Sequence, residues 1–261
     1  MKRLTTLCLS CICAFCIVCD TAFAQNPPAS NPQALAFAAQ SIAALTAGNA
    51  ISDVTLTGNV VLNAGADSGT ATLRALGTGE SRIDLVLSVG TRTEIRDAQT
   101  GAPQGKWVNP NNASGSFAPQ NCQTDAVWFY PALGSLAAGG NVVLSYIGQE
   151  TRNGRTVQHL RSYVYQSVQS PPPTPQQLSA MDFYLDAITL LPVATTFNVH
   201  PDNNATTNLL TEVDFSNYQL VGRLAVPMHI QRYQQGNLMV DVTVSAAEFN
   251  TGLPLSIFAV Y

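Results

Sequence analysis

Apolar and polar residues alternate along most of the chain after Asp53, and this period of two constrains the fold more than any other feature. In the first such segment, one face of a long strand is apolar, formed by Val54, Leu56, Val60 and Leu62. The same pattern predicts further strands at 70–76, 82–88, 91–97, 105–108, 142–146, 156–166, 182–185, 194–199, 209–215, 223–233 and 238–244. Because the connections are short and one strand face is apolar, we expect an antiparallel meander that is covered on one side only.

Two turns strengthen this interpretation. Asn153-Gly154 separates two predicted strands and is the strongest hairpin signal in the chain, because both residues tolerate positive φ. Gln235-Gly236-Asn237 is expected to connect the last two strands in a similar way.

One helix is expected before the strands. Asn31 followed by Pro32 is typical of an N-cap and a first helical position. Apolar residues then recur at helical spacing, at Leu35, Ala38, Ile42 and Leu45. Gly48 is expected to end the helix as its C-cap. The apolar face predicts a helix of about four turns that packs on the sheet.

Two segments interrupt the strand pattern. The first is an insertion at 109–140, polar and loop-like up to residue 123, whose part at 126–136 is the most aromatic stretch of the chain and is expected to cap the fold as a short helix or loop. The second is a Pro-rich linker at 167–175. A domain boundary there is one alternative. We favour a connection between two halves of one sheet, because neither half alone makes a closed β structure.

The N-terminus is typical of an exported protein. Lys2 and Arg3 precede an apolar run at 4–18, and Ala22-Phe23-Ala24 matches a signal-peptidase site. The run is too short for a membrane-spanning helix, and the Cys residues around it fit a lipoprotein signal poorly. We predict cleavage after Ala24, a periplasmic or secreted location and no transmembrane segment in the mature chain. The expected organisation is a signal peptide at 1–24, a flexible lead-in at 25–31 and a single domain at 32–261.

The sequence offers little catalytic chemistry. Its three histidines, His159, His200 and His229, have no spacing suited to a metal site, so we expect no metal and no cofactor. No nucleophile or phosphate-binding motif occurs, so no catalytic residue is assigned and the protein is predicted not to be an enzyme. A net charge of −4 without a basic patch argues against nucleic acid binding. Predicted cleavage leaves Cys122 as the only Cys, which excludes an intramolecular disulfide.

The order of motifs in the C-terminal half resembles the LolA/LolB-type lipoprotein carriers and related exported proteins. The resemblance is distant, and five segments carry it: 182–186 (DFYLD), 189–192 (TLLP), 218–230, 242–250 and 253–258. They are turn and core residues, so they concern the fold. This chain differs from true carriers in its 109–140 insertion, its Pro-rich middle and the lack of an assignable Arg-plus-lid pattern.

The resemblance implies a mainly β fold, an incomplete antiparallel β-barrel or strongly curved sheet covered by the N-terminal helix, with an apolar cavity for acyl chains. The expected ligand is a lipid or a lipoprotein acyl chain, and an envelope protein is a second expected partner. The candidate ligand-binding residues are Leu56, Leu73, Leu85, Leu87, Val226, Met228, Ile230 and Val240, with Trp128, Phe129 and Tyr130 at a mouth. Two other interpretations stay open: an envelope interaction module whose barrel is filled, and a secreted hydrolase with an unrecognised site.

Overall fold

The computed structural model describes residues 28–97, 103–124, 126–134, 136, 140–166 and 174–260. The predicted signal peptide and residues 167–173 of the predicted linker lie outside the described residues.

The described strands form one antiparallel sheet of 13 strands, in the order β6-β5-β4-β3-β2-β1-β13-β12-β11-β10-β9-β8-β7. β1 to β6 form a first wing, β7 to β13 form a second, and the pairing of β1 with β13 joins the two. The strand bounds are β1 Asp53–Leu62, β2 Asp67–Leu76, β3 Ser81–Leu87, β4 Gly90–Asp97, β5 Gln104–Val108, β6 Ser114–Ser116, β7 Val142–Arg152, β8 Arg155–Val164, β9 Met181–Asp186, β10 Pro192–Val199, β11 Leu209–Val221, β12 Leu224–Gln234 and β13 Asn237–Phe249.

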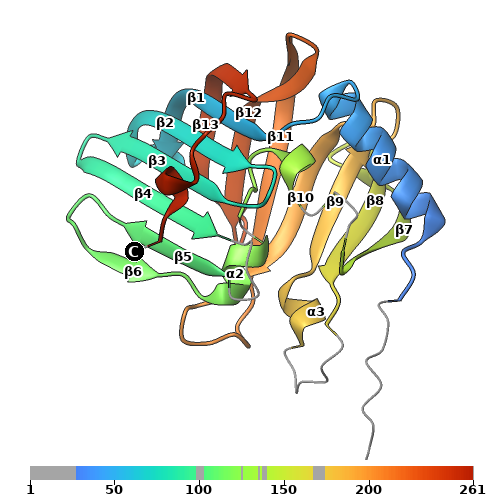
Figure 1. The fold of residues 1–261 in the computed structure, drawn as a ribbon, viewed down its shortest axis with the longest axis horizontal. Helices are drawn as coiled ribbons and strands as arrows, with labels where there is room; N and C mark the ends of the chain where they lie inside the picture. The colour runs from blue at the N-terminus through green and yellow to red at the C-terminus, as the bar shows by residue number, and fades with distance from the viewer. Residues whose placement is uncertain are drawn as a thin grey trace, which may run out of the picture.

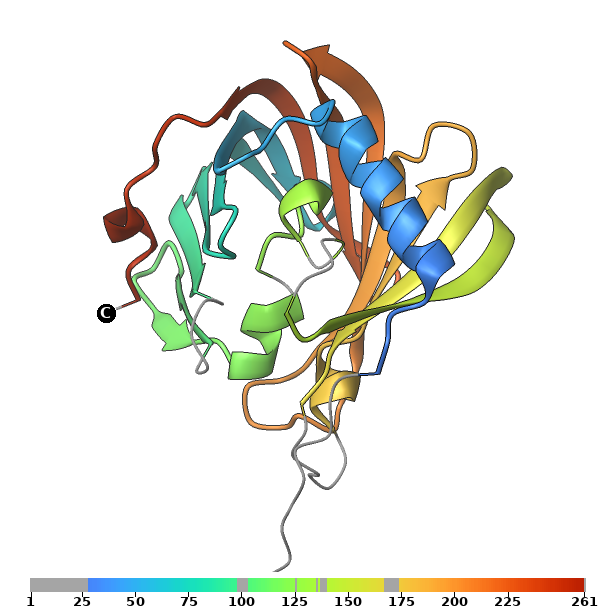
Figure 2. The same ribbon diagram turned by 45° about the vertical axis from the view of Figure 1, so that its right-hand side comes forward.

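The sheet is strongly curved and open. Its edges are β6 and β7, and no pairing among the described residues joins them. Figures 1 and 2 show the two wings bending around the segment between β6 and β7, which lies on the concave side. The predicted fold class is therefore confirmed: mainly β, an incomplete antiparallel barrel, with the N-terminal helix packed on it.

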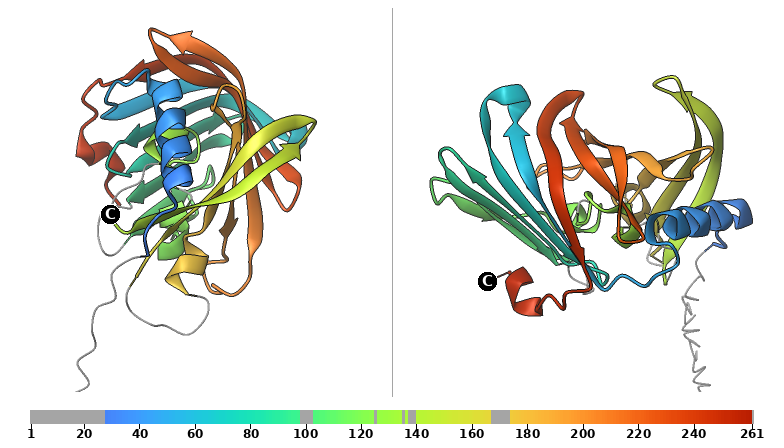
Figure 3. Two further views of the ribbon diagram at one scale, coloured as in Figure 1. Left: turned by 90° about the vertical axis from the view of Figure 1, so that its right-hand side faces the viewer. Right: turned by 90° about the horizontal axis from the view of Figure 1, so that it is seen from above.

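Helix α1 (Pro32–Thr46) begins as the sequence predicts. The side chain of Asn31 accepts hydrogen bonds from the backbone N–H groups of Gln33 and Ala34 at 2.9 and 3.0 Å. The predicted C-cap is wrong by one residue, because Ala47 is the left-handed cap and Gly48 follows it with φ of 76°. α1 packs on β7, β8 and β12 of the second wing (Figure 3).

Both predicted hairpin turns are present. Asn153 and Gly154 have φ of 50° and 76° between β7 and β8. Gln235 and Gly236 have the same pair of values between β12 and β13. Positive φ at both central residues matches the right-handed twist of the flanking strands, so these turns fix the register of their hairpins.

The inserted segment contains more regular structure than predicted. The expectation of a loop up to residue 123 is wrong, because this part contains β6 and helix α2 (Pro119–Thr124). The short 3-10 helix η2 (Pro131–Leu133) follows in the aromatic stretch. After the Pro-rich segment, Thr174 caps the one-turn helix α3 (Pro175–Leu178).

The C-terminal segment crosses the outer side of the first wing. Its 3-10 helix η3 (Leu255–Phe258) contacts β3 and β4, and Phe258 is buried (Figure 1). Asp53 at the start of β1 accepts hydrogen bonds from the backbone N–H groups of Thr251 and Gly252 at 2.8 and 3.0 Å. These bonds hold the C-terminal segment, which follows β13, against the start of β1.

Candidate functional site

The concave side of the sheet holds the main hydrophobic core, to which both wings contribute. All of the sequence-predicted candidates lie in this core or pack against it. Most are buried, and three are partly buried: Leu87, Met228 and Val240.

Trp128, Phe129 and Tyr130 lie inside the fold and do not surround an opening. Their exposed fractions are 4%, 0% and 0%. Trp128 and Phe129 meet edge to face with ring centroids 5.7 Å apart, and Tyr130 packs on Phe249 at 5.4 Å. The aromatic stretch of the insertion therefore fills much of the concave side.

A cavity of about 220 Å³ remains beside this aromatic stretch, between the first wing and strands β12 and β13. Of the candidates, Leu73, Leu85, Trp128 and Val240 line it, whereas the other seven do not. Other apolar lining residues are Leu62, Ile83, Phe117, Val199, Met239 and Val242.

One end of the cavity is charged. Arg92, Glu94 and Arg96 alternate along β4, and their register with β3 turns all three to the concave side: Arg92 pairs with Leu85, and Glu94 with Ile83. Glu94 Oε1 accepts from Arg92 Nη2 at 2.6 Å, and Glu94 Oε2 accepts from Arg96 Nη2 at 2.9 Å.

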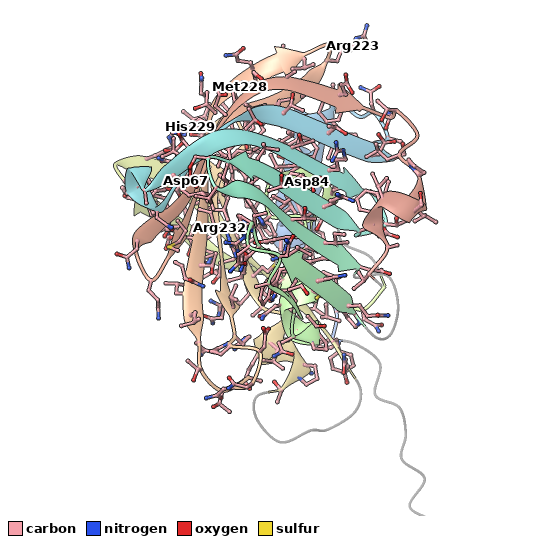
Figure 4. The ribbon with its side chains drawn as sticks, turned by 90° about the vertical axis from the view of Figure 1, so that its left-hand side faces the viewer. Asp67, Asp84, Arg223, Met228, His229 and Arg232 are labelled. Carbon is pink, nitrogen blue, oxygen red and sulfur yellow. The ribbon has the colours of Figure 1, made fainter. Side chains whose placement is uncertain are left out.

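Arg232 joins this charged end from the second wing. It lies on β12 with its guanidinium carbon 5.6 Å from the ring centroid of Trp128. Figure 4 shows it far along β12 from the exposed turn that carries Arg223. Burial raises the pKa of Glu94, but the charges of Arg96, Arg92 and Arg232 outweigh that effect and lower it to about 2. Glu94 is therefore ionised at any physiological pH.

The sequence interpretation missed this charged cluster. It treated 91–97 as a mostly polar strand, on the expectation that polar residues face solvent. The available signal was that Arg92, Glu94 and Arg96 occupy alternate positions and so lie on one face of the strand. Only the pairing of this face of β4 with Ile83 and Leu85 of β3 shows that these residues face inward.

The outer face of the sheet brings together a Ser, a His and an Asp. Ser216 Oγ lies 3.2 Å from His229 Nδ1, and His229 Nε2 lies 2.8 Å from Asp241 Oδ1. The three residues come from the adjacent strands β11, β12 and β13, and Ser216 is exposed. Beyond Asp214, β11 has no pairing with β10 in the described part of the chain, and Ser216 borders two open hollows of the outer surface.

The other two histidines are bound to protein groups. His159 Nε2 lies 3.0 Å from Asp182 Oδ1, and His200 Nδ1 lies 3.0 Å from the carbonyl oxygen of Thr207. Within the described ranges, no group of three or more His, Cys, Asp or Glu residues could hold a metal ion. The Cys122 thiol is buried, with Sγ 3.6 Å from the carbonyl oxygen of Ala118.

Comparisons with solved structures agree with the fold. A DUF1329 family protein from Desulfovibrio piger is similar at a TM-score of 0.54 and 10% identity, over 89% of this chain and 98% of that one. A domain from Vibrio parahaemolyticus, provisionally assigned to outer membrane lipoprotein sorting, has a TM-score of 0.52 and 16% identity, over 86% and 95% of the two chains. A LolA superfamily protein from Nitrosomonas europaea has a TM-score of 0.51 and 10% identity, over 87% and 97%.

The predicted resemblance to the LolA-type fold is thus confirmed at the level of structure. No family model matches the sequence, and no curated protein matches it. Among the described residues, none of the helices has the length and apolar character needed to cross a membrane.

Proposed function

We propose that this chain is an exported, non-enzymatic protein that binds an acyl chain of a lipid or a similar apolar ligand on the concave side of its sheet. The observation that supports the proposal is the cavity of about 220 Å³, which is walled by apolar side chains such as Leu73, Leu85 and Val240. Each methylene that leaves water for such a wall contributes about 0.8 kcal/mol to binding.

The cavity size favours a single chain. Sites for drug-sized ligands have volumes of roughly 300–1,000 Å³, and this cavity is smaller. A longer or second chain would have to displace the aromatic stretch at 126–136. In that case the strand candidates that do not line the present cavity would become its contacts, which is the role we propose for Leu56, Leu87, Val226, Met228 and Ile230. Phe129 and Tyr130 would contact the ligand from the displaced stretch.

The similar structures support this proposal, because proteins of the LolA superfamily and of lipoprotein sorting are among those that share the fold. We further propose a periplasmic or secreted location after cleavage at Ala24, with one domain at 32–261. Lipoprotein acyl chains or an envelope protein are the proposed partners.

The test is recovery of the mature protein from its native envelope or secreted fraction, followed by mass spectrometry of the extracted ligand. A matched pair of variants then locates the site. Val240→Phe fills the cavity, whereas Val61→Phe places the same ring on the outer face, where Val61 pairs with Asp241 and is 39% exposed.

We expect a stoichiometric acyl species in the native protein, and loss of fluorescent fatty-acid uptake in Val240→Phe but not in Val61→Phe. An empty native protein that also takes up no probe would overturn the proposal.

A second function is an interaction module with a filled barrel. The complete burial of Phe129 and Tyr130 favours it, because these rings occupy space that a hollow barrel would leave to its ligand. An empty protein together with a co-purifying envelope partner would support this alternative.

A further inference from the structure

The cavity lining is chemically asymmetric. Among the described lining residues, the charged ones are three arginines and a single carboxylate: Arg92, Arg96, Arg232 and Glu94. They gather on β4 and β12, whereas the lining of β2, β3 and β13 is apolar. An amphiphile with a charged head and an apolar tail matches this division.

The charge of the ligand's head group follows from the hydrogen-bond donors of the three arginines. A guanidinium has five N–H donors in a planar fork and no acceptor, which suits carboxylate and phosphate groups. The Nε and Nη2 atoms of Arg92 both lie within hydrogen-bond distance of Glu94 Oε1, at 3.0 and 2.6 Å. The Arg92 side chain remains 41% exposed, so a head group entering from solvent can reach its outer edge.

A second, independent donor lies in the same lining. Trp128 is 4% exposed, and its Nε1 has no hydrogen-bond partner among the described residues. An indole N–H can only donate, and a buried donor without an acceptor costs free energy. The neutral amide of Asn121, by contrast, is already engaged by the backbone of His200 at 2.7 and 2.9 Å.

We propose that the cavity binds a single-chain amphiphile whose anionic head, a carboxylate or phosphate, is held by Arg92, Arg96 and Arg232. Its tail lies along Leu73, Leu85 and Val240. This inference rests on the proposed function and adds the charge of the ligand's head group and the residues that hold it. Glu94 holds the arginines in place and competes with the head for their N–H groups.

The competition gives opposite expectations for two variants. Arg92→Gln removes a charge-assisted donor, so it should weaken binding of an anionic ligand about tenfold. Glu94→Gln removes the internal competitor, so it should strengthen anion binding severalfold. Misfolding cannot produce tighter binding, and Arg92→Gln keeps the test open if Glu94→Gln does not fold. Arg223→Gln, in the exposed turn between β11 and β12, is the matched control.

The experiment compares four ligands of equal chain length by calorimetry below their micelle concentrations: dodecanoate, dodecyl phosphate, dodecanol and dodecyltrimethylammonium. We expect at least one anion to bind about tenfold or more tighter than dodecanol, and the cation to bind weakest. The ranking of the two anions identifies the head group. Inorganic phosphate, tested for its effect on the melting temperature, is the control ligand that has the anionic group but no alkyl chain.

The possible outcomes distinguish a failure of this inference from a failure of the proposed function on which it rests. If dodecanol binds as tightly as the anions, or if Arg92→Gln leaves their affinities unchanged, the anionic head is wrong while the acyl-chain site stands. If inorganic phosphate stabilises the protein as strongly as dodecyl phosphate does, the site takes free anions and the amphiphile is wrong. If no ligand binds, the proposed function itself fails.

Discussion

Arg96 and Glu94 lie two residues apart on β4 and form an ion pair on the concave side of the sheet, with Nη2 2.9 Å from Oε2. Arg96 is 1% exposed and Glu94 is 7% exposed. Removing two charges from water costs several kcal/mol per ion, which close pairing offsets only in part. Such a cluster would destabilise a purely structural core. Its position in the cavity wall is the reason to look for a ligand there.

Glu94→Gln should lower the free energy of unfolding by about 3 kcal/mol at pH 7, because it leaves buried guanidinium groups without their carboxylate. The direction in which this stabilisation changes with pH follows from the pKa of Glu94, which is about 2 in the folded protein against an ordinary value of 4.5. The stabilisation is complete above pH 4.5 and is lost as the pH falls toward 2. Urea unfolding at pH 7 and pH 3 measures it.

The control for that measurement is Glu248→Gln, the same substitution at an exposed position of β13. It should change stability little at either pH. Equal losses in the two variants at pH 7, or a loss in Glu94→Gln that is as large at pH 3 as at pH 7, would show that Glu94 has no special role in stability.

Asp53 should hold the C-terminal segment against the sheet. Besides the backbone N–H groups of Thr251 and Gly252, the hydroxyl groups of Thr251 and Ser52 donate to it at 2.9 and 3.0 Å. Burial raises the pKa of Asp53, but these hydrogen bonds outweigh it and lower the pKa. Asp53→Ala should cost about 2 kcal/mol, because it removes the charged acceptor of four hydrogen bonds at once.

The same variant should expose the chain after residue 250 to proteases. Limited proteolysis with mass spectrometry of the fragments measures the release. Asp67→Ala, at the start of β2, removes a carboxylate whose partners are Ser68 and Ser88, so it should leave the C-terminal segment protected. Protection that persists in Asp53→Ala would mean that other contacts, such as those of Phe258, hold the segment.

Asp214 on the outer face should make the protein less stable as the pH rises. Its partial burial and the neighbouring carboxylate of Glu212 raise the pKa of Asp214 to about 7, against the opposing charge of Arg152. The folded state therefore keeps a proton that the unfolded state releases near pH 4, so stability falls between pH 4 and 7.

Asp214→Asn should remove this dependence and stabilise the protein by about 1–2 kcal/mol at pH 8, allowing for solvent screening of a partly exposed group. The melting temperatures at pH 4.5 and pH 8 measure it, with Asp202→Asn as a matched control in the 200–208 loop. A variant that gains no more at pH 8 than at pH 4.5 would contradict the expectation.

Local signals in the sequence were sufficient for the elements that local chemistry determines. The Asn31 cap and the Asn153-Gly154 turn depend on one or two residues, and both are present in the structure. Strand alternation also located most of the strands, because a half-buried strand needs period two wherever it lies in the sheet.

The site depends on contacts that no local pattern contains. The pairing of β1 with β13 joins residues nearly 200 positions apart, for example Val54 with Phe249. The inward direction of Glu94 follows from its register with Ile83, and polarity alone predicts the opposite. The aromatic stretch at 126–136 has no period of its own, so its burial could only be seen once both wings were in place.

Ser216, His229 and Asp241 should form a structural hydrogen-bond chain and not a catalytic triad. Besides the contact with His229, Asp241 accepts from Gln231 Nε2 at 2.7 Å, so its carboxylate is shared along the sheet surface. A hydrolase needs a cleft that excludes water and donors aimed at the developing oxyanion. Ser216 is instead exposed, on the face opposite the cavity, and the hollows that it borders are open to solvent.

Ser216→Ala and His229→Gln should therefore leave fatty-acid uptake unchanged and alter stability by less than about 1 kcal/mol, since the bonds lost are partly solvated. The wild-type protein should not hydrolyse p-nitrophenyl butyrate faster than buffer does. Ester hydrolysis that the wild type performs and both variants lose would revive the hydrolase interpretation. Hydrolysis that persists in both variants would instead point to a contaminant or to a different site.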